Sequence, residues 1–152
     1  MEVKLDKVGK MKVAYVELTG PYEAWGQGLM QLVSALREMK VRMSGLPIGL
    51  YYDNPLETPP EKLRSEACLP ISGRIKADNR FKLKELPAAT VAATIHQGPP
   101  EKFTDTFGAM FSWILSNGYE FYGPARETYP RISEDLRPGM GIAIQQPIRK
   151  KQ

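Results

Sequence analysis

The sequence has one cysteine and one histidine among its 152 residues, which removes several classes of site at once. Cys68 has no second cysteine with which to form an intramolecular disulfide, as is typical of proteins in a reducing compartment, so we expect a cytoplasmic location. His96 stands apart from any cluster of cysteines or carboxylates, so we expect no metal and no cofactor. The sequence also lacks a phosphate-binding loop, a dinucleotide fingerprint and a nucleophile elbow. Conventional catalysis therefore has no sequence signature.

Long apolar runs are missing as well. No stretch approaches the roughly 20 apolar residues that a membrane helix needs, and the segment 1–4 has no apolar signal core, so we expect no membrane association. The formal net charge is +4, but lysines and arginines are scattered and the only tight basic run is 149–151. We therefore expect no direct contact with nucleic acid. With 42% apolar and 25% charged residues, the composition is that of one soluble domain over residues 1–152.

What the sequence does contain is an internal repeat. Residues 13–23 reappear in blurred form as residues 91–101, at a constant offset of 91 − 13 = 78, with Val-Ala, Gly-Pro and Glu in register. Each copy has an apolar run, a Gly-Pro break and a helical apolar stripe. The pattern predicts repeat one over about 8–72 and repeat two over about 84–148, joined by the polar segment 72–84.

Both copies have the same predicted order of elements. The first gives a strand at 11–18, a helix from 22 to about 42, and strands at 48–53 and 63–71; the second gives a strand at 90–96, a helix from 103 to about 117, and strands at 119–129 and 140–146. We therefore predict an α+β fold of two strand–helix–strand–strand repeats. They are expected to lie in pseudo-twofold symmetry, with antiparallel sheets around a central groove, because neither unit covers both faces of its sheet alone.

Glu127 is the leading candidate for a ligand-binding residue. If 119–129 is one strand, alternation places Glu127 on the same face as Gly123, Ala125 and three aromatic side chains, those of Tyr119, Phe121 and Tyr129. A single carboxylate among aromatic rings is suited to holding a lipophilic cation. A second interpretation stays open, in which Glu127 pairs with Arg126 or another surface base and does nothing else.

The repeat extends this candidate site. Aligning Gly49 with Gly123 places Asp53 opposite Glu127 and Tyr51 opposite Ala125. At the starts of the helices, the 78-residue offset aligns Trp25 with Phe103, and Tyr22 precedes the first helix; Trp113 lies on the flank of the second stripe. Each of these aromatic residues has two interpretations: a wall of the groove, or a part of the core.

Four groups of residues together resemble the GyrI-like small-molecule-binding domain. They are the two Val-Ala…Gly-Pro openings, Tyr51–Asp53 with its proline-rich loop, Leu63–Glu66, and Asn117–Tyr129. The similarity spans about residues 5–148. It implies two strand–helix–strand–strand units around a groove, as in the effector-binding half of multidrug-responsive regulators of the MerR and AraC types and in free-standing proteins that include a gyrase inhibitor. In multidrug-binding members a buried glutamate meets cationic lipophilic ligands, and this resemblance assigns that role to Glu127.

We therefore predict a free-standing protein that binds lipophilic small molecules, cationic ones among them, with Glu127 as the charged anchor. The other predicted ligand-binding residues are Tyr22, Trp25, Tyr51, Asp53, Phe103, Trp113 and Tyr129. Two alternatives stay open. The first is a hydrolase of strained, cyclopropane-type electrophiles with Glu127 as acid or base, which the resemblance to some free-standing members implies; binding without turnover is favoured over it. The second is a protein-interaction module that acts on gyrase or on a separate regulator.

Overall fold

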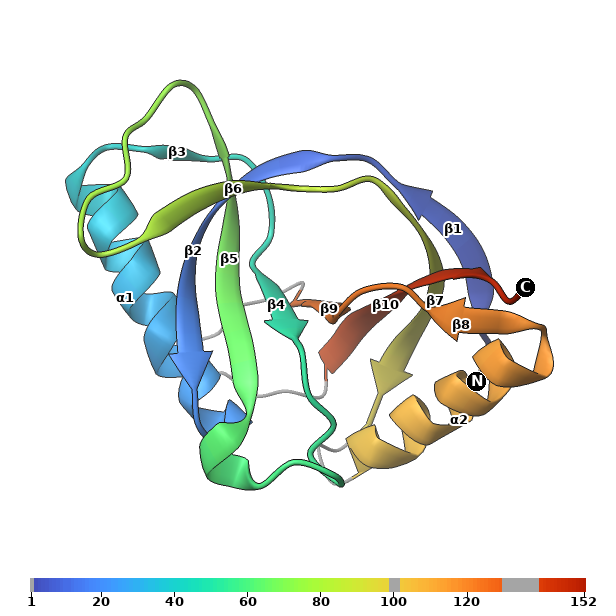
Figure 1. Ribbon diagram of the computed structural model, residues 1–152. Coiled ribbons are helices and arrows are strands. Elements are labelled where there is room, and N and C mark those ends of the chain that lie inside the picture. The colour runs from blue at the N-terminus through green and yellow to red at the C-terminus, as the bar shows by residue number, and fades with distance from the viewer. Residues whose placement is uncertain (1, 99–101, 130–139) are drawn as a thin grey trace. The chain divides into compact units, whose positions relative to one another are not determined.

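The computed structural model describes residues 2–98, 102–129 and 140–152 (Figure 1). The chain divides into two compact units. The central unit is the continuous segment Lys10–Pro87, and the terminal unit combines Met1–Gly9 with Ala88–Gln152. Among the described residues, no helix is long and apolar enough to cross a membrane.

The central unit is an antiparallel sheet with one long helix. Its strands follow the order β6-β2-β5-β4, and β3 pairs with the end of β5. The strands are β2 (Met11–Thr19), β3 (Arg42–Met43), β4 (Ile48–Tyr51), β5 (Arg64–Ser72) and β6 (Lys82–Leu86). The helix is α1 (Trp25–Glu38), preceded by the 3-10 turn η1 (Tyr22–Ala24), and a second turn, η2 (Pro60–Lys62), leads into β5.

The terminal unit is also an antiparallel sheet with one long helix, and its strands from β7 to β10 are connected like β2 to β5. Its strands follow the order β1-β7-β10-β9, and β8 pairs with the far end of β10. The elements are β1 (Lys4–Val8), β7 (Ala89–Gln97), α2 (Phe103–Ser116), β8 (Tyr119–Phe121), β9 (Ala125–Thr128) and β10 (Met140–Lys150). Every strand pair in both units is antiparallel. The α+β class is thus confirmed, whereas the symmetry that would relate the two repeats stays a prediction.

Two edge strands were not expected from the sequence. β6 lies largely within the segment predicted to be a polar connection, and β1 precedes the predicted start of the first repeat. β1 comes before β2 in the chain but pairs with β7, and β6 comes before β7 but pairs with β2. The edge strand that lies at the start of each repeat or just before it therefore belongs to the unit formed mainly by the other repeat.

The predicted strand over 119–129 is wrong in one respect, because it is interrupted. β8 pairs with 148–150 of β10, and β9 pairs with 143–145. Between them Gly123 has a φ of 139° and Pro124 has no backbone N–H to donate, so the ladder cannot continue through this point. The face shared by Glu127 is consequently set by β9 alone and not by a continuous run from Tyr119.

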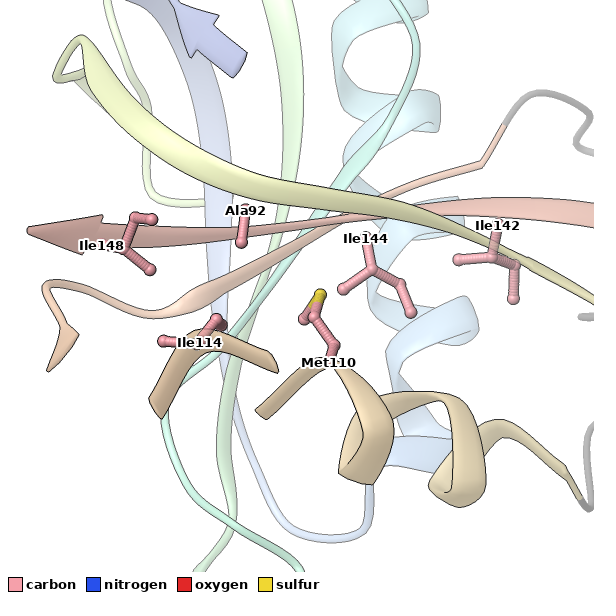
Figure 2. Packing of buried hydrophobic residues seen from close by; sticks show 6 residues of the cluster. All are labelled: Ala92, Met110, Ile114, Ile142, Ile144 and Ile148. Atoms are coloured by element: carbon pink, nitrogen blue, oxygen red, sulfur yellow. The ribbon is translucent and has the colours of Figure 1, made fainter. Parts of the chain in front are cut away.

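Each sheet carries its helix on one face. In the terminal unit, Met110 and Ile114 of α2 pack with Ala92, Ile142, Ile144 and Ile148, which we call the terminal core; Figure 2 shows Met110 and Ile144 pointing toward each other. Full burial of one such side chain stabilises the fold by about 1.5–3 kcal/mol. In the central unit, Leu18 lies against Gly28 of α1. Alternation along β2 therefore turns Val13 and Tyr15 to the opposite face, where they join the cluster of Ile48, Leu50, Cys68 and Leu86.

Candidate functional site

β9 places Glu127 on the helix-covered face of the terminal sheet. Glu127 stands directly opposite Ile144 of β10, and cross-strand partners project to the same side of a sheet. Ile144 packs against Met110 of α2, so the carboxylate is turned toward the α2 side. β9 and its partner β10 thus hold an acidic side chain on a face where the core residues of β10 are isoleucines.

Glu127 is buried and is bonded to a tyrosine. Its residue is 7% exposed, and the hydroxyl of Tyr129 donates a hydrogen bond to Oε1 at 2.7 Å. Burial raises the pKa of Glu127 to about 7, while the Tyr129 hydrogen bond acts in the opposite direction. In the described part of the chain no lysine, arginine or histidine forms an ion pair with this carboxylate. With a pKa near 7, this carboxyl group exists near neutral pH both as the neutral acid and as an anion that has no counter-ion among the described residues.

Aromatic side chains line α2 beside this core. Phe103, Phe107 and Phe111 contact one another in sequence at centroid distances of 5.0 and 5.3 Å, and Phe111 reaches Phe121 at 4.7 Å. Phe103 and Tyr129 are both partly buried against the terminal core. The acid, its hydroxyl partner and the start of the aromatic row therefore belong to one packed region.

Trp113 packs on the terminal core and stacks on Tyr119, with ring centroids 6.3 Å apart and planes 5° from parallel. This places Trp113 at an edge of the core, one of the two positions considered from the sequence. His96 is 1% exposed, and its Nδ1 lies 2.7 Å from Oγ1 of Thr106 while its ring meets Phe103 edge-on. Across the described residues no group of three His, Cys, Asp or Glu side chains could hold a metal ion.

The central unit brings together a second set of the predicted residues. The rings of Tyr22 and Tyr51 meet edge to face at 4.8 Å, and the Tyr22 hydroxyl donates to the backbone oxygen of Asp53 at 2.7 Å. Trp25 is buried and its Nε1 donates to the backbone oxygen of Glu66 at 2.9 Å. Tyr22, Tyr51 and Asp53 therefore form one contact group, in which Tyr22 comes from the turn η1 just before α1.

Asp53 does not occupy the position that the sequence alignment gave it. It lies beyond the end of β4, and its carboxylate receives hydrogen bonds from the backbone N–H and the guanidinium of Arg64, which hold its pKa below the usual range. By strand register the counterpart of Glu127 is Gly49. Gly49 stands opposite Ala67, which pairs with Val16, and Glu127 stands opposite Ile144, which pairs with Thr94. Val16 and Thr94 are themselves related by the repeat offset, 94 − 16 = 78. The side chain of Tyr51 occupies the space beside Gly49, with ring and hydroxyl atoms 2.7–2.9 Å from where a Cβ would stand. The correct offset here is 127 − 49 = 78, the same as in the first part of the repeat.

One polar cluster in the central unit was not predicted from the sequence. The carboxylate of Glu66 is bonded to the hydroxyl of Tyr52 and to the ammonium of Lys84, and that ammonium lies over the ring of Tyr15. Glu66 is the only acid within the apolar strand β5, which is a signal that could have identified it. Its partners come from the loop after β4 and from β6 and β2, and strand pairing is what brings them together.

The sequence model of the GyrI-like small-molecule-binding domain matches residues 1–141. The chain belongs to this family. A curated relative, DNA gyrase inhibitor 1 of Dickeya dadantii (strain 3937), is 29% identical over 133 residues, which cover 85% of this chain and 86% of the relative. Among solved structures, the EcmrR C-terminal domain superposes with a TM-score of 0.79 at 20% identity and 98% coverage of both chains. SAV2435, solved bound to tetraphenylphosphonium, gives a TM-score of 0.59 at 13% identity, covering 98% of this chain and 94% of SAV2435.

In this GyrI-like domain the predicted site residues fall into two groups. Glu127, Tyr129, Phe103 and Trp113 lie in the terminal unit, and Tyr22, Trp25, Tyr51 and Asp53 lie in the central unit. That the two groups line one groove stays a prediction. The hydrolase alternative also stays a prediction, and the pair of groups that it needs, an acid near neutrality and a tyrosine hydroxyl, is the bonded pair Glu127 and Tyr129.

Proposed function

We propose that this GyrI-like domain binds lipophilic organic cations, with the carboxylate of Glu127 as the charged anchor and the aromatic side chains beside it as the apolar wall. The observation that carries the proposal is the buried carboxylate of Glu127, which has a tyrosine hydroxyl as its partner and no cation from the described chain.

The electrostatic argument follows from the burial of Glu127. Two unit charges 4 Å apart attract by about 1 kcal/mol in water and by about 4 kcal/mol at the effective dielectric constant of 20 that suits protein sites. A ligand cation beside Glu127 would gain this stronger attraction and would also relieve a carboxylate that burial has made hard to ionise. The same burial is unfavourable for a small hydrated cation, which loses its water shell. Bulky cations whose charge is covered by phenyl or alkyl groups are therefore the favoured class.

The rings near Glu127 add selectivity for such cations. Tyr129 holds one carboxylate oxygen, which fixes the orientation of the acid, and Phe103 packs against the same core. Aromatic faces attract cations within about 6 Å by roughly 0.5–2 kcal/mol, more strongly when water is excluded. The structure of SAV2435 with tetraphenylphosphonium supports this ligand class by fold likeness.

The test is a titration of the purified protein with tetraphenylphosphonium, followed by tryptophan fluorescence and by isothermal titration calorimetry. We expect saturable binding with a stoichiometry near one, and an affinity at pH 8 at least about tenfold lower in Glu127→Gln, which corresponds to about 1.4 kcal/mol. Glu120→Gln is the matched control, since it removes the same charge from a surface carboxylate that pairs with Arg149. Absence of saturable binding, or equal losses in the two variants, would contradict the proposal.

A second candidate is a role directed at a protein. DNA gyrase inhibitor 1, whose name states its target, is matched over most of its length by this chain. On this alternative, the purified domain slows the supercoiling of relaxed plasmid by DNA gyrase in proportion to its concentration, and saturating tetraphenylphosphonium leaves that effect unchanged. Unchanged supercoiling at a tenfold molar excess of the domain would rule the alternative out.

A further inference from the structure

The buried acid of the central unit already has a cation. Oε1 of Glu66 accepts the hydroxyl of Tyr52 at 2.7 Å and lies 2.5 Å from Nζ of Lys84. The same Nζ lies 4.2 Å from the centroid of the Tyr15 ring. The side chain of Glu66 is only 10% exposed and that of Lys84 is 28% exposed. A carboxylate, itself bonded to a tyrosine hydroxyl, and an aromatic face thus converge on one ammonium group.

Another lysine on the same strand forms an ordinary surface ion pair, which serves as a comparison. Lys82, two residues before Lys84 on β6, pairs with Glu17, and the two side chains are 66% and 56% exposed. Exposed pairs of this kind contribute little to stability. Lys84 instead crosses over Tyr15 of β2 to reach Glu66 on β5, the strand on the far side of β2. Its ammonium is therefore held in a partly dry, three-sided enclosure.

Two parts of this enclosure contact the ammonium group, and the third orients the carboxylate. The carboxylate of Glu66 supplies the opposite charge and a strong acceptor. The Tyr15 face attracts the cation through its ring quadrupole. The Tyr52 hydroxyl donates to Glu66 and thereby fixes the orientation of the carboxylate, and burial together with Glu66 raises the pKa of Tyr52, which keeps that donor protonated. A ligand that replaces the Lys84 ammonium would need an unbranched alkyl chain like that of the lysine side chain.

We propose that Glu66, Tyr52 and Tyr15 form a second cation site, specific for primary alkylammonium groups, that the chain's own Lys84 occupies and keeps closed. A tethered ammonium competes at an effective concentration that reaches millimolar or more, so a free amine of modest affinity does not displace it. Glu17 also attracts Lys84 electrostatically and helps to hold it. Removal of the Lys84 ammonium opens the site to a ligand. The two buried acids consequently differ: Glu66 pairs with a lysine of the chain, whereas Glu127 has no cationic partner among the described residues.

The test restores the missing ammonium with a free one. Lys84→Ala leaves Glu66 without its cation, and we expect its melting temperature to fall by several degrees. Addition of n-butylammonium chloride should raise that temperature saturably, while equal concentrations of n-butanol with sodium chloride should not. Wild type should show no saturable rise with either additive. In Lys84→Ala/Glu66→Gln the response to n-butylammonium should be lost, because the acceptor charge is gone.

Two further variants, Lys82→Ala and Lys84→Gln, serve as controls. Lys82→Ala removes an ammonium from the same strand without opening an enclosure, so it should not respond to n-butylammonium. If Lys84→Ala does not fold alone, the proposal requires that it refold with n-butylammonium and not with n-butanol, as judged by near-ultraviolet circular dichroism. Lys84→Gln, whose amide still fills the space, should fold and should not respond. Equal responses of Lys84→Ala and the double variant, or no saturable response and no rescue, would overturn the proposal.

Discussion

The Tyr129 hydroxyl donates to Oε1 of Glu127 from two residues further along the chain, so the acid and its hydrogen-bond partner come from one short segment at the end of β9. By strand register, the counterpart of this pair in the central unit is Gly49 with Tyr51, where the tyrosine ring fills the space that the acid side chain occupies in the terminal unit. The same backbone arrangement therefore presents a charge in one unit and a ring in the other.

Burial of Glu127 makes the stability of the protein depend on pH. Its folded-state pKa is raised from 4.5 to about 7, so the folded protein binds this proton more tightly than the unfolded chain does. The acid therefore destabilises the fold progressively as the pH rises from about 4.5 to about 7, by roughly 3 kcal/mol in total at about 1.4 kcal/mol per pKa unit. We compare the free energy of unfolding of Glu127→Gln with that of wild type by urea unfolding. The difference, variant minus wild type, should increase by that amount between pH 4 and pH 8. A constant difference across this range would show that the acid is not desolvated.

The same proton should control the binding of a cation. A ligand cation requires the ionised carboxylate, so the affinity for tetraphenylphosphonium should rise through pH 7 and level off above it, falling about tenfold for each pH unit below the pKa. Tyr129→Phe removes the hydrogen bond that lowers this pKa, and the midpoint should move to higher pH. Calorimetric titrations from pH 5.5 to pH 9 would measure the shift. Tyr122→Phe, which removes a hydroxyl from an exposed ring, should leave the midpoint in place.

Gly49 is required by the position of the Tyr51 ring. A Cβ at residue 49 would stand 2.7 Å from two atoms of the Tyr51 side chain, and moving that ring would break its edge-to-face contact with Tyr22. We expect Gly49→Ala to lower the free energy of unfolding by about 1–3 kcal/mol. In Gly49→Ala/Tyr51→Ala the two effects should be strongly non-additive, because the second change removes the clash. Additive losses in chemical denaturation would contradict this account.

The two helices contain glycines with opposite tolerance for a methyl group. Gly108 of α2 is exposed, and a Cβ there would meet nothing within 4 Å, so Gly108→Ala should stabilise the protein by about 1 kcal/mol through helix propensity alone. A Cβ on Gly28 of α1 would stand 2.7 Å from Leu18, so the same gain there is outweighed by overpacking. Thermal unfolding should place Gly108→Ala above wild type and Gly28→Ala below it. The reverse order would contradict the packing of α1 on β2.

The parts of the fold that could be predicted from the sequence are those with a strong local pattern. The apolar stripe that begins near Trp25 and its copy from Phe103 predicted both long helices, and the 78-residue offset relates the helices residue by residue. The edge strands β1 and β6 were missed because they are rich in lysine and acidic residues, as edge strands commonly are, and so they read as polar connections.

The candidate site was predictable only where one segment contains it. Glu127 and Tyr129 are two residues apart, so alternation on a strand was enough to place them together even though the predicted strand was too long. The partners of Glu66 could not be found in this way, since Lys84 reaches it across an intervening strand and the two are 18 residues apart in sequence. Asp53 was misplaced because the second half of the repeat was aligned on a shared glycine. Strand register aligns that segment differently, because Gly49 and Glu127 hold matching places in their ladders.

The pairing of β1 with β7 has a consequence for the order of events during synthesis. The central unit is a continuous segment that is complete once residue 87 has left the ribosome, but Lys4 must wait for Ala93, its partner in the ladder. At about 5–20 residues per second, the N-terminal strand then remains without its partner for on the order of ten seconds. Its charged residues suit that delay, because a polar strand is slow to pair with the wrong chain. A segment made before the central unit is thus among the last to take its place in a sheet.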